Sequence, residues 1–213
     1  MLPEETRLRI GGRDMEKNWL APVVLESSHA RLLPLALEHH EQLQDAIADG
    51  ELWKLWYTAV PSPAELQADI VKRLTRQAEY SCLPFTVVDP ASGRVVGMTN
   101  FLNVDSDHRR VEIGGTWYRK DVQRTSLNTA CKLLLLTHAF ETLDCIAVEF
   151  RTHFFNQDSR KAIERLGAKL DGVMRNHSRA KNGTLRDTCV YSLLPHEWPT
   201  VKAHLEFQLA RPR

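Results

Sequence analysis

The stretch Glu112–Phe140, EIGGTWYRKDVQRTSLNTACKLLLLTHAF, changes its pattern twice. Alternating residues typical of a β-strand come first, then a polar segment, then an apolar run typical of a buried helix. Alternation places strand residues on two faces, with Val111, Ile113, Gly115 and Trp117 expected on one and Glu112, Gly114, Thr116 and Tyr118 on the other. The paired glycines allow something flat or backbone-like to approach closely.

The polar segment coincides with the start of the long helix. The first turn of a helix presents unpaired backbone N–H groups and about half a positive charge, so it attracts anions such as phosphate. Arg124 and the hydroxyls of Thr125, Ser126 and Thr129 would reinforce such a site. The alternative is an ordinary solvated helix start. Neither Gly-rich nucleotide-binding signature occurs, which disfavours an ATPase or a dehydrogenase.

Outside this stretch, helices and strands mix along the chain. Helices are expected over residues 37–48, 62–80, 156–169 and 195–210, with Ser62 and Glu65 opening the second of these. Strands are expected in a short pair before residue 37, in a hairpin over 84–104 with its turn at Asp89–Gly93, and over 109–120, 145–153 and 184–194. In the strand 145–153, Ile146, Val148 and Phe150 are expected to point inward. The fold class is therefore mixed α/β (α+β) with a mostly antiparallel sheet.

Composition indicates one globular domain over residues 21–213, preceded by an N-terminal extension over residues 1–20. The net charge of +1 argues against nucleic acid or an anionic membrane as a partner. The cysteines are far apart, which disfavours zinc and disulfides and suggests small core residues. No metal site is expected. The absence of an apolar signal core and of a long apolar run favours a cytoplasmic location.

Three segments in a specific order resemble the GCN5-related N-acetyltransferases (GNAT), in the branch similar to ribosomal-protein N-terminal acetyltransferases of the RimJ/RimL type. These are the E-I-G strand, the polar loop Gln123–Asn128 that opens a long helix, and N-x-x-S-x-x-A-I-x-x-L-G-A from Asn156 to Ala168. The resemblance extends from about Val24 to Leu209. It implies a central sheet with splayed core strands, flanked by helices, and acetyl-CoA as a cosubstrate.

The resemblance also implies which residues bind acetyl-CoA. Loop amides would wrap the pyrophosphate, a backbone N–H of the E-I-G strand would polarise the thioester carbonyl, and Asn156 would bind the pantetheine arm. The implied residues are Ile113, Gly114, Gly115, Thr116, Gln123, Arg124, Thr125, Ser126, Leu127, Asn128, Thr129, Asn156 and Ser159. Ser126 and Asn128 stand where the family has small residues or glycine. Because amides do the wrapping, we expect the loop to keep CoA binding.

Transfer of an acetyl group to an amine requires a base for the amine and an acid for the departing thiolate. Glu112 is the candidate base, with a solvated or salt-bridged strand residue as the alternative. Ser159 is the candidate acid, although capping of the following helix would also explain it and Asn156. Glu149 is a weaker candidate base, and pairing with Arg151 is the preferred interpretation for it. His108, His138 and His153 are further titratable candidates, with a core position as the alternative for His138 on the buried helix.

The acceptor side is expected near Trp53, Trp56 and Tyr57, whose alternative role is core packing. Arg179, Lys181 and Arg186 could face acidic groups of a substrate or simply be solvated. The predicted function is an acyl-CoA-dependent N-acyltransferase acting on a protein N-terminus or a small amine, without a covalent enzyme intermediate. A non-catalytic acyl-CoA-binding or sensing module is the alternative. The sequence is compatible with a monomer or a homodimer.

Overall fold

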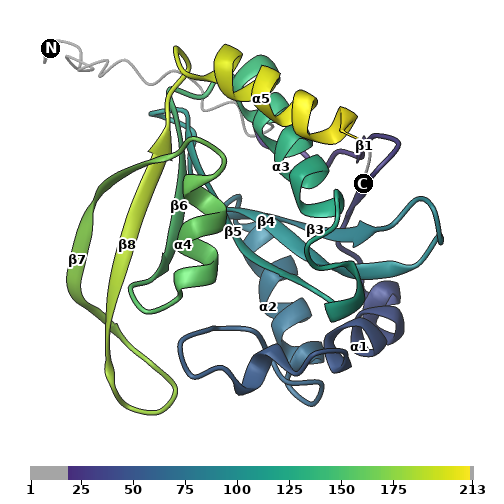
Figure 1. The fold of residues 1–213 in the computed structure, drawn as a ribbon. Helices are drawn as coiled ribbons and strands as arrows, with labels where there is room; N and C mark the ends of the chain where they lie inside the picture. The colour runs from purple at the N-terminus through teal and green to yellow at the C-terminus, as the bar shows by residue number, and fades with distance from the viewer. Residues whose placement is uncertain (1–18, 212–213) are drawn as a thin grey trace, which may run out of the picture.

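A computed structural model describes residues 19–211, which form one eight-stranded sheet with helices on both faces (Figure 1). The strand order is β1-β2-β3-β4-β5-β6-β8-β7, and the only parallel pair among these strands is β5 with β6. The mostly antiparallel mixed fold is confirmed. The strands are β1 (Leu25–Glu26), β2 (Arg31–Pro34), β3 (Cys82–Val88), β4 (Val95–Asp105), β5 (Arg110–Tyr118), β6 (Ala147–His153), β7 (Lys169–Arg179) and β8 (Leu185–Leu193).

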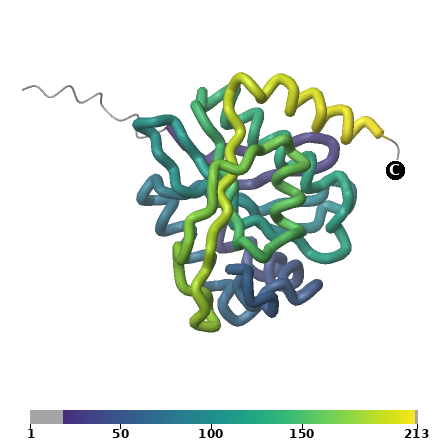
Figure 2. Tube along the Cα trace, turned by 60° about the vertical axis from the view of Figure 1, so that its left-hand side comes forward, coloured from purple at the N-terminus to yellow at the C-terminus, as the bar shows by residue number. Residues whose placement is uncertain are grey.

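Two hydrophobic clusters lie on opposite faces of the sheet. On one face, α3 (Leu127–Thr137) and α5 (Trp198–Ala210) pack against a large core that includes Ile113 and Phe150. On the other face, α1 (His40–Ala48) and α2 (Leu66–Ala78) cover a smaller core around Met98 and Trp117. The short α4 (Gln157–Glu164) follows β6 directly, and the β7–β8 hairpin extends along the side of the molecule (Figure 2). The sheet therefore separates two differently built halves.

The first residues of α2 and α3 show how side-chain hydrogen bonds and sequence define where these helices begin. The Glu65 carboxylate accepts hydrogen bonds from the backbone N–H and the hydroxyl of Ser62, at 2.8 and 3.0 Å, so these two residues form the predicted helix start. Regular α-helix begins slightly later, at Leu66. The long apolar helix likewise begins at Leu127 and continues from Thr137 into a π-helical turn, His138–Thr142. The segment Gln123–Ser126 is therefore a loop ahead of the helix.

The predicted alternation along β5 is wrong beyond Gly115. Gly115 has a φ of +58°, and the β4–β5 register shifts between the pairs Met98–Trp117 and Asn100–Gly114. This is a β-bulge, which inserts one extra residue and reverses the faces of the residues that follow. Trp117 therefore packs in the smaller core, whereas Ile113 and Tyr118 belong to the large one.

Three further predictions concern packing. Ile146 does not point inward: it precedes β6, its side chain is exposed, and Ala147 takes the first buried position. The four cysteines are free and buried, as predicted for small core residues. Residues 1–18 of the predicted extension lie outside the described residues, while the indole N–H of Trp19 donates to the Leu143 carbonyl at 3.0 Å. None of the helices within residues 19–211 is long and apolar enough to cross a membrane.

Candidate active site

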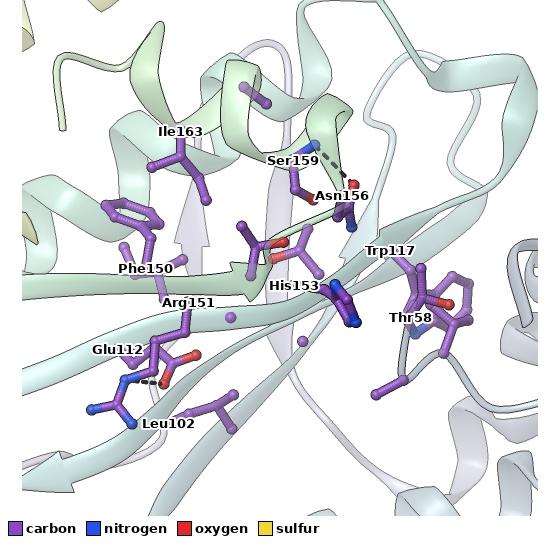
Figure 3. Close-up of a pocket in the computed structure, with 18 of the residues that line it drawn as sticks. Thr58, Leu102, Glu112, Trp117, Phe150, Arg151, His153, Asn156, Ser159 and Ile163 are labelled. Carbon is purple, nitrogen blue, oxygen red and sulfur yellow. Dashed lines mark hydrogen bonds and ion pairs between the residues drawn. The ribbon is translucent and has the colours of Figure 1, made fainter. Parts of the chain in front are cut away.

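A cavity of about 800 Å³ lies where β5 and β6 separate (Figure 3). The two strands pair only from Arg110–Ala147 to Glu112–Glu149, although both continue beyond these positions. Backbone groups of the diverging segments are thereby released from the ladder between them. The predicted splay of the core strands is thus present, and it opens the sheet from one face to the other.

The cavity brings together most of the residues predicted for the site. Its lining includes Tyr57, Glu112, Ile113, Gly114, Gly115, Thr116, Gln123, Arg124, Asn128, Asn156 and Ser159. Six other predicted residues are not part of that lining, namely Trp53, Trp56, Thr125, Ser126, Leu127 and Thr129. Leu127 is buried in the large core and Trp53 packs against the smaller one, so core packing accounts for both.

Glu112 is a buried carboxylate rather than a solvated strand residue, with only 6% of its surface exposed. It accepts a hydrogen bond from Asn103 at 2.6 Å and lies 3.5 Å from the guanidinium of Arg151. Burial raises the pKa of its carboxyl, against the opposing effects of Arg151 and Asn103. A carboxylate held in this way is suited to accept a proton near neutral pH.

The paired glycines make room for side chains of the protein itself. A Cβ on Gly114 would lie 2.6 Å from a Glu112 carboxylate oxygen, and one on Gly115 would lie 2.8 Å from the Asn100 amide nitrogen. Asn100 donates to the carbonyls of both glycines, at 2.9 and 3.3 Å, and accepts from Arg73 at 2.7 Å. The buried amide of Asn100 therefore stabilises the bulge, and the missing side chain of Gly114 leaves room for the Glu112 carboxylate.

The loop before α3 keeps a geometry that does not need the family's glycine. Ser126 has a φ of −68° and a ψ of −19°, ordinary helical values, whereas the left-handed residue of the loop is Arg124, with a φ of +63°. The Thr125 hydroxyl donates to the Val122 carbonyl at 2.7 Å and accepts from the Leu127 N–H at 3.3 Å. Thr125 therefore stabilises the loop, and Gln123 and Arg124 line the cavity beside the helix N-terminus.

Asn156 caps α4, because its side-chain oxygen accepts from the Ser159 N–H at 3.1 Å. The capping interpretation is confirmed, and both side chains still line the cavity (Figure 3). Glu149 forms the predicted pair with Arg151, at 2.8 Å, and also pairs with Arg110. It does not line the cavity.

His153 is buried at the end of β6, where its Nδ1 accepts the Phe155 N–H at 3.1 Å. The neutral ring must therefore carry its proton on Nε2, which has no hydrogen-bond partner among the described residues. Burial, with a contribution from Arg186, lowers the pKa of the ring and keeps it neutral. His153 thus offers a donor rather than a base. Trp56 packs against it with ring centroids 5.0 Å apart.

The other histidines and the hairpin cations have different positions. His108 is exposed and contacts Asp105, and burial lowers the pKa of His138 on the helix. Arg186 lines the cavity. Lys181 pairs with Glu65 at 2.9 Å, which ties the β7–β8 turn to the start of α2.

Sequence reasoning missed four cations on the cavity wall, Lys72, Arg73, Arg76 and Lys132, and Lys132 is the buried one among them. It lies within the apolar run of α3, is 7% exposed, and donates to the Thr116 hydroxyl at 3.2 Å. A lysine among leucines on a helix gives little sign of its direction, because long side chains can also extend toward solvent. The signal that could have revealed it is its spacing of four residues from Asn128, which puts both on one helix face beside the cavity.

A splayed α+β sheet, a polar loop at the N-terminus of the helix after β5, and a capped helix after β6 define an acyltransferase type of fold. Residues 29–169 match the family model described as "Acetyltransferase (GNAT) domain". The chain belongs to this family.

Similar proteins agree with this assignment. A GCN5-related N-acetyltransferase from Brucella melitensis has a solved structure with a TM-score of 0.79 and 29% identity, aligned over 89% of this chain and 86% of its own. A "putative acetyltransferase from T. thermophilus" gives 0.77 and 34%, over 88% and 97%. The "Putative ribosomal N-acetyltransferase YdaF" of Bacillus subtilis (strain 168) is 35% identical over 106 residues, 50% of this chain and 57% of that relative. The chain thus spans a little over half of this curated relative.

Proposed function

We propose that the protein is an N-acetyltransferase that transfers the acetyl group of acetyl-CoA directly to a primary amine. The observation that carries the proposal is the position of Glu112, a buried carboxylate at the last β5–β6 pair, where the cavity crosses the sheet. A non-catalytic CoA-binding module has no need for a carboxylate with a raised pKa at this point. The loop geometry supports CoA binding, because Ser126 adopts helical angles without glycine.

The two sides of the cavity carry residues that suit two different substrates, the acyl donor and the amine acceptor. Gln123, Arg124 and Asn128 line the cavity beside the N-terminus of α3, which suits the phosphates of the acyl donor. Glu112 lies on the opposite side, where it would accept a proton from the attacking amine. Asn156 and Ser159 also line the cavity, as candidates for contact with the pantetheine arm and the thioester.

We infer that the acceptor is the N-terminal amine of a protein rather than a simple alkyl amine. His153 lines the cavity, and its Nε2–H, which protein atoms cover in this structure, has no partner among residues 19–211, so it would donate to a substrate oxygen that displaces this cover. A peptide N-terminus carries a carbonyl oxygen close to its amine, whereas an alkyl amine has none. The name of the Bacillus subtilis relative supports the same class. We further propose a cytoplasmic reaction and a monomeric or homodimeric enzyme.

Thiol release from acetyl-CoA tests both levels of the proposal, which are the acetyl transfer itself and the class of the acceptor amine. The acceptors are a short peptide with a free α-amine, the same peptide with its α-amine blocked and one internal lysine, and an alkyl diamine. We expect release only with the first peptide, which mass spectrometry should show acetylated at its N-terminus. Release with the diamine alone would contradict the acceptor class, and release with none of the three would contradict both levels.

A further inference from the structure

Lys132 places a positive charge at the opening of the sheet. Its ammonium donates to the Thr116 hydroxyl of β5 at 3.2 Å and lies 5.9 Å from the centre of the Phe150 ring of β6. Phe150 directly follows Glu149, the last residue of β6 that pairs with β5. The ammonium thus lies between the two separating strands and on the wall of the cavity.

Lys132 and Glu112 reach this opening from opposite faces of the sheet. Lys132 extends from α3, which packs on the face that carries Ile113. Glu112 neighbours Ile113 and points to the other face, where Asn103 and Arg151 hold it. One cavity therefore has a carboxylate on one side and an ammonium on the other.

The charge of Lys132 has no carboxylate within ion-pair distance among residues 19–211. The titratable group next to it is Cys131 on α3, which in turn interacts with Tyr118 on β5, and burial raises the pKa of both, so they stay uncharged. Elsewhere on the cavity wall, Arg124 and Asp158 are the charged groups of the α3 loop and α4. Burial lowers the pKa of the Lys132 ammonium to about 8. A buried cation of this kind favours an anion that forms beside it.

Given the acetyl transfer proposed above, we propose that the Lys132 ammonium stabilises the thiolate of coenzyme A as it departs. The amine nitrogen forms a bond to the thioester carbon, and its surplus proton passes to Glu112. When the C–S bond breaks, its electron pair goes to sulfur, and the thiolate forms beside the Lys132 ammonium. Coenzyme A takes a proton from water as it leaves the cavity, and water removes the proton from Glu112.

Charge favours Lys132 over Ser159 for this step. A thiol has a pKa of about 8.5 in water, so the departing thiolate is a weak base and gains most from a positive charge beside it. The Ser159 hydroxyl is uncharged. Ser159 is then left to position the pantetheine arm at the start of α4.

The first test needs only the wild-type protein and coenzyme A. The ultraviolet absorbance of the thiolate is followed from about pH 6 to pH 9, around the ordinary thiol pKa, with desulfo-coenzyme A as the reference. The protein's own thiols titrate above their ordinary range because they are buried, so they do not interfere. We expect the bound thiol to be at least about tenfold more acidic than the free thiol, a shift of one pKa unit. Titration like that of free coenzyme A would overturn the role of Lys132.

Substitution provides the second test. Lys132→Met should abolish the shift in thiol acidity and lower turnover about 100-fold, the usual size of a lost group that stabilises developing negative charge. Its affinity for desulfo-coenzyme A should not change, because the sulfur is absent. Ser159→Ala should lower turnover less than Lys132→Met does. The inference fails if the order of these two losses is reversed, and the titration of the wild type decides the matter if Lys132→Met does not fold.

The two proposals fail in different ways. If the wild type neither binds coenzyme A nor releases thiol with any amine, the acetyltransferase function is wrong. If binding and turnover are present but the bound thiol has its ordinary acidity, only the role of Lys132 is wrong.

Discussion

The two sides of the cavity are held in place by contacts of different range. On the α3–α4 side, Thr125 bonds to residues two and three positions away, and Asn156 bonds to Ser159. On the α2 side, Glu112 is held by Asn103 from the neighbouring strand, and Asn100 by Arg73 from a helix. The donor side is thus formed by two short segments, whereas the acceptor side depends on the assembled sheet. Substitutions on the two sides should therefore affect different measurements.

The largest effect is expected for Glu112→Gln. The amide keeps the size of the side chain but cannot accept the amine's proton, so turnover at neutral pH should fall about 100-fold. Affinity for acetyl-CoA should stay unchanged, because the donor side is intact. Steady-state kinetics and calorimetry measure the two quantities. Glu79→Gln, an exposed carboxylate at the end of α2, is the matched control. A variant with normal turnover would show that Glu112 only stabilises the strand.

A smaller effect, on the affinity for CoA rather than on turnover, is expected for Arg124→Glu. The substitution places a negative charge on the cavity wall beside the N-terminus of α3 and should weaken CoA binding at least about tenfold, since charged hydrogen bonds contribute about 1.5–3 kcal/mol. The pH dependence of turnover at saturating acetyl-CoA should stay the same. Arg165→Glu makes the same charge change at an exposed position after α4. Equal loss of affinity in both variants would remove Arg124 from the phosphate site.

The contrast also explains what the sequence could predict. The loop before α3 and the cap of α4 are each formed by residues that are close together in the sequence, so their residue types indicate their structure. The bulge at Gly115 could not be placed, because a glycine pair does not say which residue takes a positive φ or where the partner strand shifts its register. The side chain of Glu112 was assigned to the correct face, but its burial depends on Asn103 and Arg151. Lys132 was missed because its direction is set by the packing of α3 on the separated strands.

The smallest effect is expected for Glu149→Gln, which tests how the neighbours of Glu112 set the pKa of its carboxyl. Glu149 raises the pKa of Glu112 by charge repulsion, and it also draws Arg151 toward itself. Glu149→Gln removes the repulsion and frees Arg151 for Glu112, so both changes lower the pKa of Glu112. A base with a lower pKa stays ionised at lower pH, and the acidic limb of the turnover profile should therefore move to lower pH, with little change on the plateau. Profiles of the two proteins with one acceptor peptide make the comparison, since the acceptor's own ionisation is then common to both. A limb that stays in place would mean that Glu112 does not set it, even if Glu112→Gln is inactive.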